Sequence, residues 1–187
     1  MTQDMILQTA MRQYTTYGIR GVSMNEIANS LRISKKTLYC NFRNKEELIM
    51  ESVRTETEKI QKGMERHVAD SSCALEALLR FKQEASQRDL CVCPAFHRDL
   101  PGFPQAYSKF TAFKDQLRQR VRELLEQAIG EGMLIREQNY DLIAHLYVEN
   151  TENSAGQHEL MLTLLRGSCT PQGKEWIDRS PYLHASV

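Results

Sequence analysis

Apolar side chains recur at helical spacing along almost the whole chain, and this pattern limits the fold more than any other feature. Ile6, Ala10, Tyr14 and Tyr17 are separated by four, four and three residues, which places them on one face of a helix over about residues 4–17. A longer stripe of the same kind runs through residues 105–129. Alternating β-branched runs, the usual mark of strands, are absent from the sequence. The sequence therefore predicts an all-α fold.

Two short segments near the N-terminus each follow a serine and are joined by a tight turn. Gly18 is expected to end the first helix, because glycine takes the left-handed conformation at no steric cost. Ser23 then begins a short helix, with Glu26 three residues later in the capping-box position. Residues 32–33 form the turn, and Ser34 begins the next short helix. Two short helices joined in this way are predicted to form a helix-turn-helix.

The second short helix has one face for the core and another that carries polar groups. Leu38 and Phe42 are four residues apart and fix the core face. The side chains that point away are those of Lys36, Thr37, Cys40 and Asn41. Lysine, threonine and asparagine can contact base edges, while Tyr39 at the edge and Lys45 beyond the helix suit phosphate oxygens. This face is therefore predicted to enter the major groove of DNA.

The charges are distributed unevenly although the net charge is zero. Residues 1–45 contain seven Lys or Arg and two acids, a balance of 7 − 2 = +5, so the remainder carries −5. A basic N-terminal part on an acidic remainder indicates that the N-terminal part meets a polyanion.

Several other classes of protein are disfavoured by composition. No apolar run approaches the roughly 20 residues that span a bilayer, and the first residues do not form a signal peptide. We therefore expect a cytoplasmic protein without membrane contact. When bound to DNA it would be associated with the nucleoid. Five cysteines, an odd number and mostly far apart, fit a reducing compartment. Glycine-rich phosphate loops and HExxH or nucleophile-elbow motifs are absent, so we expect neither an enzyme nor a resident metal or cofactor.

From Ile6 to Ile49 the sequence resembles the TetR (tetracycline-repressor) family of bacterial transcription regulators. The matching residues combine capping, core and contact positions, and they are Ile6–Leu7, Ala10, Tyr14, Gly18, Ser23–Met24, Ile27–Ala28, Ile33–Ser34, Thr37–Leu38–Tyr39, Phe42 and Lys45–Glu46–Glu47–Leu48. Three positions depart from the family pattern. Tyr14 stands where phenylalanine is usual, Arg32 where glycine is frequent in the turn, and Lys36 where glycine or proline is frequent. Arg32 is expected to strain the turn slightly or to add a phosphate contact.

The resemblance implies a homodimer whose paired recognition helices enter successive major grooves of a palindromic double-stranded operator. It places Thr37, Cys40 and Asn41 nearest the bases. It places Ser23, Lys36, Tyr39 and Lys45 nearest the phosphates, and Lys35 joins this predicted DNA-binding set. Residues 1–47 would form the DNA-binding domain, a helix over about residues 45–67 would connect, and residues 48–187 would bind an unknown small-molecule effector and dimerise. The implied function is a one-component regulator, a repressor released by that effector.

The second domain resembles the family in layout more than in sequence. The residues that we predict around the effector are Phe81, Phe96, His97, Phe103, Phe110, Phe113, Leu117 and His145. The residues that we predict at the dimer interface are Leu142, Leu146, Tyr147, Leu160, Met161, Leu164 and Leu165, some of which could instead be intramolecular core.

Two alternatives to effector sensing stay open. Cys91 and Cys93, with His97 nearby, could form a redox- or metal-sensing site, although cysteines two apart on a helix point to different faces. The chain could also be a helical protein-interaction module whose basic part binds acidic partners. Selectivity for DNA sequence would separate that alternative from an operator-binding regulator.

Overall fold

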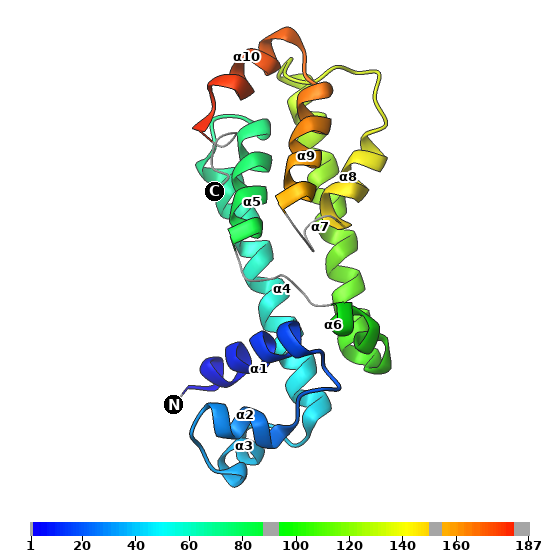
Figure 1. Ribbon diagram of the computed structural model, residues 1–187. Helices are drawn as coiled ribbons and strands as arrows, with labels where there is room; N and C mark the ends of the chain where they lie inside the picture. The colour runs from blue at the N-terminus through cyan, green and yellow to red at the C-terminus, as the bar shows by residue number, and fades with distance from the viewer. Residues whose placement is uncertain (1, 88–93, 150–154, 182–187) are drawn as a thin grey trace. The chain divides into compact units, whose positions relative to one another are not determined.

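The computed structural model describes residues 2–87, 94–149 and 155–181, and within these ranges the chain is helical without strands, as predicted (Figure 1). The helices are α1 (Gln3–Tyr17), α2 (Met24–Ser30), α3 (Lys35–Asn41), α4 (Lys45–Asp70), α5 (Ala74–Gln87), α6 (Pro94–Asp99), the 3-10 turn η1 (Leu100–Gly102), α7 (Pro104–Gly130), α8 (Tyr140–Glu149), α9 (Ala155–Gly167) and α10 (Pro171–Arg179). None of the helices in these ranges is long and apolar enough to cross a membrane.

The chain forms two compact units, each built from two separate stretches of sequence. The head unit comprises Met1–Ile60 and Asp89–Phe113, and the body unit comprises Gln61–Arg88 and Lys114–Val187. Residues of α4 and α7 therefore belong to both units. The boundary predicted between residues 47 and 48 concerns the division of functions and stays a prediction.

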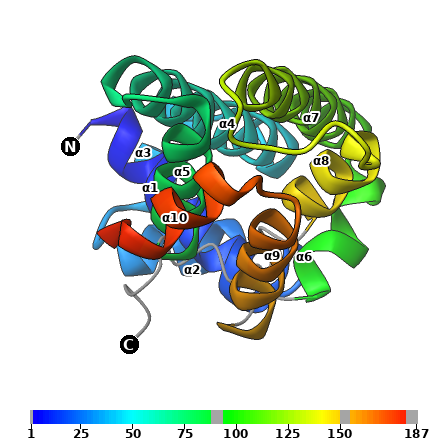
Figure 2. The same cartoon turned by 90° about the horizontal axis from the view of Figure 1, so that it is seen from above.

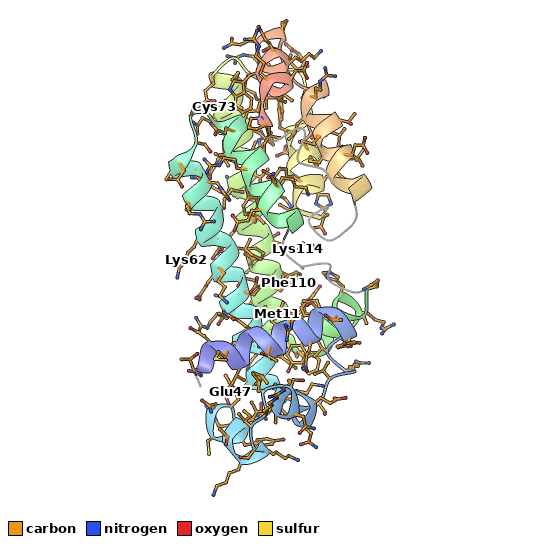
Figure 3. All side chains as sticks on the ribbon, turned by 60° about the vertical axis from the view of Figure 1, so that its left-hand side comes forward. Met11, Glu47, Lys62, Cys73, Phe110 and Lys114 are labelled. Carbon is orange, nitrogen blue, oxygen red and sulfur yellow. The ribbon has the colours of Figure 1, made fainter. Side chains whose placement is uncertain are left out.

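Side-chain caps define the starts of α2, α3 and α4, and the sequence predicts those of α2 and α3 from Ser23 and Ser34. Ser23 and Glu26 form the capping box of α2, with 3.2 Å from Glu26 N to Ser23 Oγ and 2.6 Å from Ser23 N to Glu26 Oε2. Asn44 Oδ1 accepts the N–H of Glu47 at 2.8 Å at the start of α4, where Figure 3 labels Glu47. These bonds satisfy backbone donors that lack partners inside the helix.

Gly18 ends α1 in a conformation that differs from the predicted one. Its φ is +82°, as expected for glycine, but its ψ of 156° makes it extended rather than left-handed helical. The chain extends here because α6 lies against this point: a Cβ on Gly18 would be 2.7 Å from Ala95 Cβ. Both the positive φ and the close approach require glycine.

The segment around Pro94 is helical, although Pro94, Pro101 and Pro104 lie close together in the sequence. Pro94 begins α6, a position where proline's missing N–H would have had no intrahelical partner. Phe96, Leu100 and Ala106 are buried with α1–α4 in one core, and the half-buried Phe103 and Phe110 pack against it (Figure 3 labels Phe110). The head unit is thus completed by residues far along the chain.

The phenol of Tyr14 lies in the middle of this core. Tyr14 is fully buried, and no described residue forms a hydrogen bond with its hydroxyl. Burial raises the pKa of this phenol above its ordinary value, because the phenolate would be desolvated.

We expect Tyr14→Phe to raise the free energy of unfolding by about 1 kcal/mol, because it removes a buried hydroxyl that lacks a partner. Equilibrium urea denaturation at one fixed protein concentration measures the change. Tyr107→Phe, at a tyrosine that is 43% exposed on α7, is the matched control and should leave stability unchanged. A Tyr14→Phe variant less stable than the wild type would contradict this description of the core.

Tyr147 organises the core of the body unit. Its hydroxyl donates to the Leu78 carbonyl at 2.6 Å, and its ring stacks with Phe81 at a centroid distance of 6.4 Å. The buried Lys82 places Nζ 5.3 Å from the Tyr147 ring centroid and 3.4 Å from the Tyr147 carbonyl oxygen. Burial lowers the pKa of Lys82 to about 8, since the ammonium loses water.

The C-terminal helix α10 spans nine residues and includes Trp176. Thr170 caps it by accepting the Gly173 N–H at 3.1 Å, and Pro171 follows at its first position. Thr170 also donates its N–H to the Met133 carbonyl at 3.0 Å. The bond to Met133 connects the start of α10 to the segment between α7 and α8. Because that segment is distant from α10 in the sequence, the spacing of apolar residues could not predict this contact.

Candidate nucleic-acid interface

The turn between α2 and α3 has the tight geometry that a helix-turn-helix needs. The N–H of Ile33 donates to the Ala28 carbonyl at 3.0 Å, which closes the turn. Arg32 has a φ of +54°, so the residue that stands in place of glycine adopts a left-handed conformation. This conformation costs a non-glycine residue about 1–2 kcal/mol, in agreement with the predicted strain.

The two faces of α3 are divided as the sequence predicts. Leu38 is fully buried and Phe42 is 1% exposed, so both anchor the helix in the head-unit core. The polar face is exposed along its length, and its residues are Lys35, Lys36, Thr37, Cys40 and Asn41. Tyr39 lies at the edge and is 39% exposed. A basic and hydrogen-bonding surface is therefore presented on a helix whose other side is fixed.

Hydrogen bonds within α3 orient part of this surface. Ser34 Oγ accepts the Thr37 N–H at 3.0 Å and lies 2.8 Å from Thr37 Oγ1. Asn41 Nδ2 donates to the Thr37 carbonyl at 2.8 Å, which occupies one of its two N–H donors. The second N–H of this amide can still donate to a base edge. The Thr37 methyl group stays available for contact with a thymine methyl.

Cations surround α3 in the sequence and in space. Residues 32–45 contain five Lys or Arg and no acid. Lys35 Nζ lies 5.8 Å from the centroid of the Tyr39 ring, within the range of a cation–π contact. Arg43, directly after α3, has a side chain that is 89% exposed and lies 3.5 Å from Glu47. The sequence prediction named Arg32 as a possible phosphate contact but omitted Arg43, which the count of charges could have identified.

The remaining predicted phosphate contacts are Ser23 and Lys45. Ser23 is exposed but its hydroxyl already serves the capping box of α2. Lys45 is half-buried at the start of α4; burial lowers the pKa of its amine, and the charges of Asp99 and Glu26 oppose that shift. The sequence did not indicate a role for Asp99 near the helix-turn-helix. Asp99 contacts the loop residue Arg20, which lies 79 residues earlier in the chain.

The residues predicted around an effector do not all lie in one unit. Phe96, His97, Phe103, Phe110 and Phe113 belong to the head unit, whereas Phe81, Leu117 and His145 belong to the body unit. Four of the head-unit rings are neighbours: the centroid distances are 5.6 Å for Phe96–His97, 6.2 Å for Phe96–Phe110 and 6.4 Å for Phe110–Phe113. Phe96 belongs to the buried core that supports α1–α4, which gives it a structural role.

The residues predicted at a dimer interface fall into two groups. Tyr147, Met161 and Leu165 are fully buried inside the body unit. Leu142 on α8 and Leu160 on α9 are 51% and 49% exposed, and Leu146 and Leu164 are half-buried. Helices α8 and α9 lie side by side (Figures 1 and 2), so the exposed leucines come from neighbouring elements.

The predicted thiol pair, Cys91 and Cys93, lies outside the described residues. Within those residues, no group of three or more His, Cys, Asp or Glu side chains could hold a metal ion. An open groove of about 590 Å³ between α4 and α7 of the body unit is lined by Met64 and Leu117, with polar residues such as Gln61 and Arg120. Leu117 is the one predicted effector residue in that lining.

Comparison with known proteins places this geometry in context. Residues 6–51 match the family model described as bacterial regulatory proteins, tetR family. A TetR-family transcriptional regulator from Agrobacterium tumefaciens is similar in structure with a TM-score of 0.79 at 18% identity, covering 89% of this chain and 97% of that one.

Two further solved structures share the fold. The ketosteroid transcriptional regulator KstR2 of Mycobacterium tuberculosis gives a TM-score of 0.68 at 19% identity, over 89% of this chain and 94% of that one. A gamma-butyrolactone receptor described as ArpA-like gives a TM-score of 0.72 at 17% identity, over 94% and 91%. No curated protein sequence matches the chain.

Proposed function

From its match over residues 6–51 to the tetR family of bacterial regulatory proteins, we propose that this chain is a one-component transcriptional repressor. It would bind a palindromic operator as a homodimer. The observation that carries the proposal is α3, whose exposed cations and hydrogen-bonding groups are held rigidly by the buried Leu38 and Phe42. A helix fixed in this way can place side chains against base edges in a major groove.

The stoichiometry on DNA tests this proposal. Two chains should bind one palindromic duplex, and the logarithm of the binding constant should fall linearly with the logarithm of salt concentration as phosphate counterions are released. Analytical ultracentrifugation with a labelled duplex gives the stoichiometry, and fluorescence anisotropy gives the salt slope. Binding of single chains with no preference for sequence would contradict the proposal.

A second copy of the chain is the partner that we propose for α8 and α9. Support comes from Leu142 and Leu160, two large apolar side chains that are about half exposed on adjacent helices, with Leu146 and Leu164 beside them. Burying such side chains against their copies removes apolar surface from water. A symmetric pairing of this face would make each leucine contact the same region of the partner.

We expect Leu142→Lys/Leu160→Lys to raise the dimer dissociation constant at least about tenfold, because each dimer would bury four ammonium groups in an apolar contact. Sedimentation velocity over a range of concentrations measures this change. Met5→Lys/Tyr107→Lys replaces two exposed apolar side chains of the head unit and serves as the matched control. A leucine variant that keeps the wild-type mass distribution would show that dimerisation uses another face.

Release by an effector completes the proposed mechanism. A ligand that binds better to the conformation with weak DNA affinity shifts the population toward it, and DNA must weaken ligand binding by the same factor. Phe110 and Phe113, whose rings are neighbours within the head unit, favour an apolar effector. Titration of a candidate ligand with and without operator tests this reciprocity; a ligand that binds equally well in both cases is not the effector.

A further inference from the structure

A buried carboxylate on α6 lies against the loop that joins α1 to α2 in the head unit, where α1 and α6 are in contact (Figure 1). Asp99 is 3% exposed, and its Oδ2 accepts a hydrogen bond from the backbone N–H of Arg20 at 2.8 Å. A Cβ on Gly18 would lie 3.1 Å from the same oxygen. The loop and the carboxylate therefore fit closely together.

The position of Asp99 is unfavourable for a charge unless its partners compensate. It is buried, and it ends α6, where the helix dipole is negative. Two guanidinium groups approach Oδ1, with Arg20 Nε at 3.9 Å and Arg98 Nε at 3.7 Å, but both side chains are more than 70% exposed and water screens them. The hydrogen bond from the Arg20 N–H and the charge of the half-buried Lys45 therefore provide the main compensation.

Asp99 is connected to two of the predicted DNA contacts. The loop that it holds leads directly into Ser23, the N-cap of α2, and α2 packs against α3. The negative charge of Asp99 also acts on the amine of Lys45, together with that of Glu26. Asp99 therefore contacts the loop before α2 and also acts electrostatically on Lys45, which follows α3.

We propose that Asp99 is a positioning residue for DNA binding, which holds the α1–α2 loop through the Arg20 N–H and so keeps α2 and α3 in the arrangement that fits an operator. This inference rests on the proposed function and deepens it, because it makes α6 part of the DNA-binding apparatus. The residue acts through the backbone and touches no DNA itself.

Whether removal of Asp99 raises or lowers the affinity for operator DNA distinguishes this proposal from a purely electrostatic effect. Loss of an acid from a DNA-binding unit should strengthen binding to a polyanion if charge alone mattered. The proposal requires the opposite: Asp99→Ala should weaken binding to the selected operator at least about tenfold, as expected for loss of a hydrogen bond to a charged group. Binding to non-specific DNA should not weaken, so the selectivity ratio should fall.

Two variants serve as controls in the same anisotropy titrations. Asp4→Asn removes an exposed acid from α1 of the same unit and should bind the operator at least as tightly as the wild type. Asp99→Asn keeps an acceptor oxygen for the Arg20 N–H but removes the charge, so it should restore part of the selectivity that Asp99→Ala removes. All titrations are run well below the melting temperature of each variant, determined by circular dichroism.

Hydrogen exchange on the wild-type protein keeps the proposal testable even if the variants do not fold. The Arg20 amide should exchange at least about tenfold more slowly than a free loop amide, since it donates to a buried carboxylate. Rapid exchange at Arg20 would overturn the proposal, as would an Asp99→Ala variant with wild-type selectivity. A wild-type protein that selects no DNA sequence would instead overturn the proposed function, whatever the exchange at Arg20.

Discussion

The double variant Lys36→Ala/Tyr39→Ala should bind the operator at least about 100-fold more weakly than the wild type. A dimer would lose two ammonium groups and two phenols from its recognition helices, and removing groups that bind phosphate reduces both the affinity and its salt dependence. Both side chains are exposed or at the edge of the core, so the variant should fold normally. Fluorescence anisotropy with a labelled operator at fixed salt measures the change in affinity.

The matched control for this variant removes the same chemical groups elsewhere. Lys62→Ala/Tyr107→Ala takes away an exposed lysine of α4 in the body unit and a 43% exposed tyrosine of α7. It changes the net charge equally, so general electrostatic attraction falls by a similar amount. We expect its affinity to stay within about threefold of the wild type. Equal reductions in affinity for the two variants would indicate that α3 is not the reading element.

Gly18→Ala should lower the free energy of unfolding by about 3 kcal/mol. A φ of +82° with a ψ of 156° is nearly restricted to glycine, which accounts for about 1–3 kcal/mol of strain in any other residue. The new Cβ would also lie 2.7 Å from Ala95 Cβ, which forces α6 away from α1. Urea denaturation at fixed protein concentration measures the change.

A double-mutant cycle separates the two causes of this destabilisation. Gly18→Ala/Ala95→Gly removes the clashing methyl group but keeps the backbone strain, so it should restore only part of the stability. Gly130→Ala is the control glycine, because a Cβ there would meet no atom within 4 Å, and its stability should be unchanged or slightly higher. A Gly18→Ala variant as stable as the wild type would mean that α6 does not lie against α1 as described.

The parts of this fold that depend on local chemistry were predictable from the sequence. Ser23 and Asn44 cap their helices through bonds that span three residues, and short spacing fixes such bonds in any tertiary context. The division of α3 into a face with Leu38 and Phe42 and an exposed polar face follows from helical periodicity. The strain at Arg32 was expected from the family resemblance, because glycine is frequent at this turn position, and the positive φ of Arg32 agrees with it.

The contacts that depend on distant segments were not predictable. Nothing near Asp99 or Phe96 in the sequence indicates that they complete the unit formed by the first 60 residues. Helices with apolar residues on two faces also conceal which face is internal: Tyr147 and Met161 are buried within the body unit, whereas Leu142 and Leu160 are exposed. The residues predicted around an effector divide between the two units, because each unit combines two separate stretches of the sequence.

Selection of bound duplexes from a random DNA pool tests the central claim most directly. The wild-type protein should enrich a palindrome with half-sites separated by about one or more helical turns, because two α3 helices related by a two-fold axis would read both halves. The enriched sequence should disappear from a parallel selection with Lys36→Ala/Tyr39→Ala. A pool in which no sequence is enriched, with only weak binding that salt abolishes, would contradict the assignment of this chain as an operator-binding regulator.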